Sequence, residues 1–215
     1  LHLLATNDGV DVMVGTATKA REAEFQAIYF PILKGLNGWR IPIIQQGKAD
    51  LFSKINTLAE LKKLKIGLFH TWTDVEIFEY NGFEVAKGTT HKGMFKMLDK
   101  GRFDYLPQSI IQAKPDVYAH DELKLAIDNY VLIKYPSAYY YYVNKGNDEL
   151  AKDIKTGLEL ALADGSFERL FQAAFGQVLE KYSIEKRTVF TLLNPLLVDE
   201  NLIGREDFWA QIDDF

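Results

Sequence analysis

Residues 64–107 read LKIGLFHTWTDVEIFEYNGFEVAKGTTHKGMFKMLDKGRFDYLP, and this stretch decides the fold class. In it, short apolar runs alternate with segments of helical spacing. The apolar runs are 64–69, 83–86 and 103–106, and the helical segments are 73–80 and 91–100. Gly82 and Gly101 follow the two helical segments, where glycine readily adopts the left-handed conformation that ends a helix. Strands alternating with helices predict an α/β protein with a mostly parallel sheet covered by helices.

Helix starts are marked by polar residues at capping positions. Thr57 and Glu60 have the spacing of a capping box ahead of a short helix over 58–61. Thr73 and Glu76 repeat that spacing and predict a second capping box.

Two extended segments, 39–46 and 137–144, bracket the β-α-β block. Pro42 favours an edge or crossing strand for the first of them, and Pro107 is expected to close the last strand of the block. Beyond the second segment, the spacing predicts helices over 148–163 and 167–180. We therefore expect the chain to leave one lobe, build a second and return. The expected boundaries are 1–46 with 137–215 for lobe one and 47–136 for lobe two.

Composition excludes several function classes. A chain of 215 residues holds one to two domains. The 25 Lys and Arg against 30 Asp and Glu give a net charge of −5, which argues against nucleic acid as the main partner. The absence of cysteine excludes disulfides, thiolate zinc sites and cysteine nucleophiles. No apolar run reaches the roughly 18 residues that span a bilayer, so no direct membrane insertion is expected.

Metal and cofactor motifs are missing from the sequence. The 4 histidines are scattered without the spacing of a metal site. No phosphate loop, dinucleotide fingerprint or nucleophile elbow occurs. We expect neither a metal nor a cofactor.

Several segments, taken in order, resemble the type II periplasmic solute-binding proteins, in the amino-acid-binding branch that serves ABC transporters. The stretch from Asp11 to Glu22, DVMVGTATKARE, is similar to the motif of the first lobe in that family. Further segments resemble the entry into lobe two, its Gly-Arg-x-Asp strand and the return to lobe one. These are LAELKKLKIG from Leu58, GRFD from Gly101 and VNKGNDEL from Val143.

The resemblance implies a fold of two α/β lobes joined by two crossing strands. Family members have a β-α-β segment ahead of the motif that begins here at Asp11, and about ten residues precede it in this chain. The chain also begins without Met. The resemblance therefore predicts a first lobe that lacks its N-terminal β-α-β.

For function, the resemblance implies an extracytoplasmic receptor in the periplasm of a Gram-negative envelope. It would capture an amino acid or related carboxylate and deliver it to the membrane permease of an ABC importer, without catalysis. One alternative is the same module as the sensing domain of a signalling receptor. A second is a dehydratase-like enzyme on this fold, for which Asp104 or His70 would be the general acid.

In lobe one, the resemblance assigns the ligand's α-carboxylate to Arg21. A guanidinium suits this role because it is always charged and binds carboxylate through two parallel N–H donors. Thr18 and Thr16 would line the same turn. The alternative is a solvated surface arginine beside Glu22 and Glu24.

In lobe two, Thr71, Trp72 and Thr73 lie at a strand-to-helix turn, where free N–H groups attract anions. The family carries a small Gly-Thr-Thr-like turn there, and Trp72 departs from it. The alternative is that Trp72 packs within the lobe and that Asp74 complements the helix dipole. We assign Asp74 no role in binding a carboxylate, because it would repel one.

A second departure from the family follows the GRFD segment. Amino-acid binders usually carry a carboxylate five residues beyond the aspartate, here Asp104, to hold the α-ammonium. This chain has Ser109 there, preceded by Gln108, and neither supplies a charge. We expect Gln108 and Ser109 to contact the ligand, which is then an amino acid, another carboxylate or a polar solute. Asp104 itself is expected to be structural.

Overall fold

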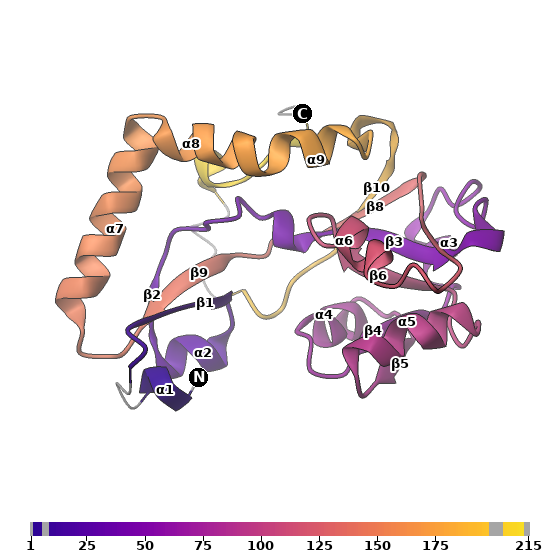
Figure 1. Ribbon diagram of the computed structural model, residues 1–215, viewed down its shortest axis with the longest axis horizontal. Helices are drawn as coiled ribbons and strands as arrows, with labels where there is room; N and C mark the ends of the chain where they lie inside the picture. The colour runs from indigo at the N-terminus through magenta and orange to yellow at the C-terminus, as the bar shows by residue number, and fades with distance from the viewer. Residues whose placement is uncertain (1, 6–8, 198–203, 213–215) are drawn as a thin grey trace. The chain divides into compact units, whose positions relative to one another are not determined.

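The computed structural model describes residues 2–5, 9–197 and 204–212 of the chain. Contacts between residues divide the chain into two compact units, and their elements can be followed in Figure 1. Unit 1 comprises Leu1–Asn37, Pro136–Val178 and Leu196–Phe215, and unit 2 comprises Gly38–Tyr135 and Leu179–Pro195.

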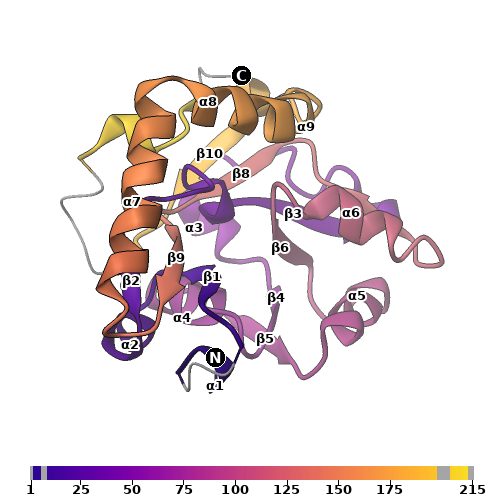
Figure 2. The same cartoon turned by 60° about the vertical axis from the view of Figure 1, so that its left-hand side comes forward.

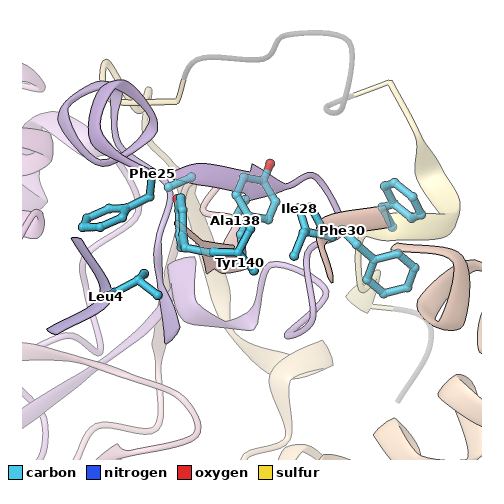
Figure 3. Packing of buried hydrophobic residues seen from close by; sticks show 11 residues of the cluster. Leu4, Phe25, Ile28, Phe30, Ala138 and Tyr140 are labelled. Carbon is cyan, nitrogen blue, oxygen red and sulfur yellow. The ribbon is translucent and has the colours of Figure 1, made fainter. Parts of the chain in front are cut away.

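Unit 1 contains an antiparallel sheet of three strands in the order β1-β9-β2. The strands are β1 (Val12–Thr16), β9 (Tyr139–Val143) and β2 (Gln26–Ile28). The tyrosines of β9 alternate between the two faces of the sheet, as a strand requires. Tyr140 and Tyr142 are buried, and Figure 3 shows Tyr140 gathered with Phe25 and Ala138 in the core of this unit.

The helices of unit 1 are α1 (His2–Ala5), α2 (Lys19–Glu24), α7 (Asp148–Ala163) and α8 (Ser166–Phe171). They include the predicted helix over 148–163, whereas α1 and α2 were not predicted. Helix α9 (Gln177–Glu180) begins in unit 1 and ends in unit 2. The longest, α7, lies beside β2 and β9 (Figure 2). It ends ahead of Gly165, whose φ of +74° is left-handed. The predicted helix 167–180 is continuous but contains one π-helical stretch, Gln172–Gly176, between α8 and α9.

The C-terminal part of the chain packs into unit 1. Phe208 is buried, and its ring centroid lies 5.1 Å from that of Phe30. The Ala210 amide donates to the Lys34 carbonyl over 2.8 Å. Gly35 has a φ of +79°, and a Cβ there would lie 2.6 Å from Trp209, so the indole requires glycine at this position.

Unit 2 contains a sheet of seven strands in the order β10-β8-β3-β6-β4-β5, with β7 also paired to β3. The strands are β3 (Trp39–Gln45), β4 (Ile66–Phe69), β5 (Val85–Gly88), β6 (Tyr105–Ser109), β7 (Leu125–Ile127), β8 (Val131–Lys134) and β10 (Thr188–Thr191). The sheet is mixed rather than mostly parallel as predicted. Strand β3 lies inside the sheet and runs antiparallel to β6, β7 and β8, while β4 is parallel to β5 and β6.

Both proline predictions for this sheet were wrong. Pro42 lies in the interior strand β3 and faces Pro107, which lies within β6 rather than closing it. The Ile110 amide donates to the Trp39 carbonyl, which makes the neighbouring Arg40–Ser109 pair a non-hydrogen-bonded pair. By alternation the two prolines also form such a pair, so neither removes a hydrogen bond from the ladder between the two strands.

The helices of unit 2 are α3 (Leu58–Leu61), α4 (Asp74–Tyr80), α5 (His91–Asp99) and α6 (Ala113–Tyr118). The capping box of Thr57 and Glu60 is confirmed, with both reciprocal hydrogen bonds present. The predicted box of Thr73 and Glu76 was wrong. Thr73 has helical backbone angles, φ −58° and ψ −26°, and its side chain makes no capping bond, since capping requires an extended residue.

Helix α5 supplies much of the core of unit 2. Met94, Phe95 and Leu98 are fully buried and pack with Phe103. Gly67 of β4 allows a close approach at this core, because a Cβ there would lie 2.2 Å from the Phe103 ring.

The boundaries of the units differ from the expected ones at two segments. Residues 38–46 belong to unit 2 because β3 is a central strand of its sheet. Residues 179–195 belong to unit 2 because β10 pairs in parallel with β8. Arg187 reinforces this return: its Nε donates to the Tyr182 carbonyl over 2.9 Å and its Nη1 to the Val131 carbonyl over 3.0 Å.

Candidate ligand-binding residues in the two units

In unit 1, Thr16, Thr18 and Arg21 come together at the turn from β1 to α2. Thr18 is the N-cap of α2, and its hydroxyl accepts a hydrogen bond from the Arg21 amide over 3.2 Å. The Arg21 guanidinium donates through Nη1 to the Thr16 carbonyl. Asn37 holds the other side of the turn, since its amide nitrogen lies 3.3 Å from the Thr16 hydroxyl. The three predicted residues therefore form one connected turn.

Arg21 is half-buried rather than a solvated surface arginine. Its Cζ lies 5.8 Å from the centroid of the Tyr142 ring, and a Cβ at Gly15 would come within 3.1 Å of that Cζ. The neighbouring Glu22 accepts a hydrogen bond from the Tyr29 hydroxyl instead. Among the described residues no carboxylate pairs with Arg21, and its Nε is buried without a hydrogen-bond partner. This arrangement leaves a cation with unused donor capacity.

The Arg21 guanidinium also lies next to a buried hydroxyl. Burial raises the pKa of Tyr142 well above its ordinary value, so this phenol stays neutral and presents its ring to the cation. A cation over an aromatic face is attracted to it, which helps to hold the guanidinium in place.

Unit 1 also contains a separate cavity of about 580 Å³ beside β2 and the start of α7. Its lining includes Glu22, Tyr29, Lys145 and Lys152. None of the predicted ligand-binding residues lines this cavity.

In unit 2, the predicted residues lie at one end of the sheet, where the carboxyl ends of β4 and β6 are found. Thr71–Thr73 follow the carboxyl end of β4, and Gln108 and Ser109 form the carboxyl end of β6. The two strands are parallel neighbours, so their carboxyl ends lie on the same side. Open α/β sheets bind their ligands at the carboxyl ends of the strands.

These residues differ in their exposure to solvent. Thr71 is exposed, while Trp72 is half-buried and makes edge contacts with Phe69 at 6.1 Å and His91 at 5.7 Å. The indole thus packs against Phe69 and His91 within unit 2, and its contact with a ligand stays a prediction.

Gln108 and Ser109 are buried in the sheet of unit 2. The Gln108 amide donates to Asp116, and its carbonyl accepts from the Ser109 amide over 2.9 Å. Ser109 is fully buried, and its hydroxyl has no partner among the residues that the structure describes. Gln108 is therefore engaged internally, whereas Ser109 retains an unused hydrogen-bonding group.

Asp104 has the structural role expected of it. Its carboxylate accepts a hydrogen bond from the Lys65 amide over 2.8 Å and lies 3.5 Å from the Lys48 ammonium. The Asp104 amide in turn donates to the Lys65 carbonyl. These bonds tie the start of β6 to the start of β4.

Sequence reasoning missed a buried polar network at the same end of the sheet of unit 2. Arg40 Nη2 lies 2.8 Å from Asp74 Oδ1, and Arg40 Nε donates to the Tyr135 hydroxyl over 2.7 Å. That hydroxyl donates to Asp74 Oδ1, which closes the ring. Asp74 is thus an ion-pair partner rather than a helix-dipole residue. The one signal in the sequence was the charge of Arg40 within an apolar strand.

The electrostatics of this network follow from its burial. Burial alone would lower the pKa of Arg40, but the adjacent Asp74 and Tyr135 raise it above its ordinary value. Burial also raises the pKa of Tyr135 far above its ordinary value, so the phenol remains protonated and can donate to Asp74. The Arg40 guanidinium is therefore charged and the Tyr135 phenol is neutral at physiological pH.

No group of three or more His, Asp or Glu that could hold a metal ion occurs in the described part of the chain. Within the same residues, no helix has the length and apolar character needed to cross a bilayer.

Solved structures identify the fold. Two structures of an ancestral arginine-binding protein, one bound to arginine and one bound to glutamine, align with this chain. Their sequence identities to it are 22% and 23%, and their TM-scores are 0.56 and 0.58. The probable amino-acid ABC transporter extracellular-binding protein ytmK from Bacillus subtilis is 21% identical, with a TM-score of 0.58. The ancestral amino acid-binding protein AncCDT-1, a precursor of cyclohexadienyl dehydratase, is 16% identical, with a TM-score of 0.52.

These alignments cover 81% of this chain, and they cover 75% of the first two proteins and 72% of the third. No protein-family model matches the chain, and no curated protein matches it by sequence. At these identities the likeness establishes the fold. The chain has the α/β fold of these amino-acid-binding proteins, which confirms the predicted fold class, while the absence of an N-terminal β-α-β from the first lobe stays a prediction.

Proposed function

We propose that the chain is an extracytoplasmic solute-binding receptor for an amino acid or related carboxylate. The observation that carries this proposal is Arg21. It is held at a structured turn by Thr16 and Thr18, it lies against Tyr142, and it has no acidic partner among the described residues. A half-buried guanidinium with unused donors is suited to a carboxylate ligand.

In this proposal, unit 2 contributes the turn Thr71–Thr73 and the hydroxyl of Ser109. The turn precedes α4, and N–H groups at a helix start favour anions. Asp74 does not oppose a carboxylate there, because its charge is neutralised by Arg40. Ser109 offers a hydroxyl rather than a charge for an ammonium group, so we propose a ligand class that includes carboxylates without an α-ammonium.

We propose binding without catalysis and delivery to an ABC importer. Asp104, one of the two residues nominated as the general acid of a dehydratase-like reaction beside His70, is engaged by Lys65 and Lys48. The structures with this fold described above are an ancestral arginine-binding protein, a probable extracellular-binding protein of an amino-acid ABC transporter, and an ancestral amino acid-binding protein that is a precursor of cyclohexadienyl dehydratase. A periplasmic location and a permease partner belong to the same proposal.

A thermal-shift screen of the full chain tests the proposal, with L-arginine, L-glutamine, succinate and glucose as probes. A ligand that binds only the folded state raises the melting temperature in a concentration-dependent way. We expect a rise with at least one carboxylate and none with glucose. The absence of a rise with every carboxylate, or a rise with glucose alone, would contradict the proposal.

A further inference from the structure

Three buried polar side chains from different elements of unit 2 meet in one closed ring. They are Arg40 of β3, Asp74 at the start of α4 and Tyr135 directly after β8. Their exposed fractions are 5%, 4% and 3%. Each pair in the ring is joined by a hydrogen bond or an ion pair. A buried ion pair is compatible with folding only when its hydrogen bonds are satisfied, and this ring satisfies them.

The position of the ring is specific. Asp74 directly follows the turn Thr71–Thr73 that we assign to ligand binding. Arg40 faces Ser109 across the ladder between β3 and β6, so the ring also lies beside the second assigned group. Together the contacts tie the start of α4 to the interior of the sheet.

Two of the three residues also lie where the chain passes between the units. Gly38 and Tyr135 are the residues of unit 2 at two of these passages, and the Tyr135 amide donates to the Gly38 carbonyl over 3.1 Å. Arg40 follows Gly38 by two residues. The ring therefore connects the assigned ligand turn to these two passages within unit 2.

Neutralisation of Asp74 gives the ring a second effect. A free carboxylate at the start of α4 would repel an anionic ligand at the adjacent turn. Arg40 compensates that charge, since its Nη2 lies 2.8 Å from Asp74 Oδ1. The Tyr135 hydroxyl donates to the same oxygen.

We infer that Arg40, Asp74 and Tyr135 are positioning residues that hold the turn Thr71–Thr73 in the geometry and charge state that bind the ligand. The ring couples the turn to the segments of unit 2 that directly follow Asn37 and directly precede Pro136, where the chain passes between the units. This role deepens the proposed function and rests on it for the ligand, but the positioning itself is measurable without any ligand.

Hydrogen–deuterium exchange of the ligand-free full chain tests the positioning. Peptides over 70–76 report on the turn, and peptides over 91–99 report on α5, whose Met94, Phe95 and Leu98 pack with Phe103 in the core of the same unit. Tyr135→Phe removes one hydroxyl from the ring. We expect exchange at 70–76 to become roughly fivefold faster, with 91–99 unchanged, because the local opening becomes easier.

Tyr105→Phe is the matched control, since its hydroxyl is equally buried but has no partner among the described residues. It should leave exchange at 70–76 unchanged. Arg40→Lys keeps a cation beside Asp74 and should restore most of the protection that Arg40→Met removes. Equal acceleration of 70–76 and 91–99 by Tyr135→Phe, or no acceleration of either, would overturn the inference.

The two proposals fail separately. Loss of local protection in Tyr135→Phe without a thermal shift by any carboxylate would support the positioning role and contradict the proposed ligand class. A thermal shift with unchanged exchange at 70–76 would support the ligand class and contradict the positioning role.

Discussion

Arg40 and Asp74 form a buried ion pair, with Nη2 and Oδ1 2.8 Å apart and side chains only 6% and 5% exposed. Removal of one partner leaves an uncompensated buried charge, whereas removal of both does not. The effects of substituting Arg40 and Asp74 on the free energy of unfolding should therefore be strongly coupled.

The first prediction concerns this coupling. Arg40→Met should lower the free energy of unfolding by about 3–5 kcal/mol, because the Asp74 carboxylate loses its cation. The double variant Arg40→Met/Asp74→Leu should cost much less than the sum of the two single changes. Urea denaturation of all four proteins measures the cycle, and additive costs would show that the pair is not coupled.

The second prediction contrasts the two threonines that the sequence places at capping positions. Thr57→Ala should lower the free energy of unfolding by about 1 kcal/mol, since the Thr57 hydroxyl accepts from the Glu60 amide. Thr73→Ala should cost less than half of that, because Thr73 makes no capping bond. Equal losses for both variants in urea denaturation would contradict the observed difference in capping.

The third prediction compares two glycines. Gly67→Ala should lower the free energy of unfolding by about 1–3 kcal/mol, because the added Cβ would lie 2.2 Å from the Phe103 ring. Gly157→Ala should raise it by roughly 0.5–1 kcal/mol, because Gly157 lies inside α7 with open space around it. Thermal unfolding by circular dichroism gives both signs, and a stable Gly67→Ala variant would contradict the close packing.

The fourth prediction is a pH dependence in unit 1. Burial would raise the pKa of Glu168, but hydrogen bonds from Lys34 and Gln172 outweigh it and lower that pKa below 4.5. The stabilisation is therefore present above the unfolded value of about 4.5 and is lost as the pH falls through the lower folded value. The melting temperature of wild type should fall toward that of Glu168→Gln between about pH 6 and about pH 3.

Glu159→Gln serves as the control for that titration. Glu159 faces Lys155 at 3.8 Å on the exposed surface of α7, where an ion pair contributes little. The melting temperature of Glu159→Gln should equal that of wild type at every pH. A constant difference between wild type and Glu168→Gln across the range would exclude a titrating contribution from Glu168.

Local signals in the sequence predicted most of the elements. The bounds of α7, Asp148–Ala163, match the predicted helix because the apolar spacing ends at a glycine with left-handed backbone. The box of Thr57 and Glu60 is also a local feature. Thr73 and Glu76 have the same spacing without the same structure, because Thr73 continues the helical backbone and the adjacent Asp74 turns into the unit to meet Arg40.

The features that were missed depend on contacts between distant residues. The opposition of Pro42 and Pro107 is a matter of strand register, which the local sequence of either strand does not contain. The ring of Arg40, Asp74 and Tyr135 joins residues separated by up to 95 positions in the chain. For the candidate site, the turn of Thr16, Thr18 and Arg21 is as connected as predicted, whereas Gln108 is engaged within its own unit.

The central claim is that Arg21 binds the carboxylate of a small ligand, and calorimetric titration of the full chain with L-arginine, L-glutamine and succinate tests it. Wild type should bind at least one of these probes. Arg21→Ala should weaken that binding by at least about 2 kcal/mol, and Arg21→Lys should also bind less well because the bidentate fork is lost. Arg102→Ala, at an exposed position of unit 2, should bind as wild type does. Unchanged affinity in Arg21→Ala would contradict the account.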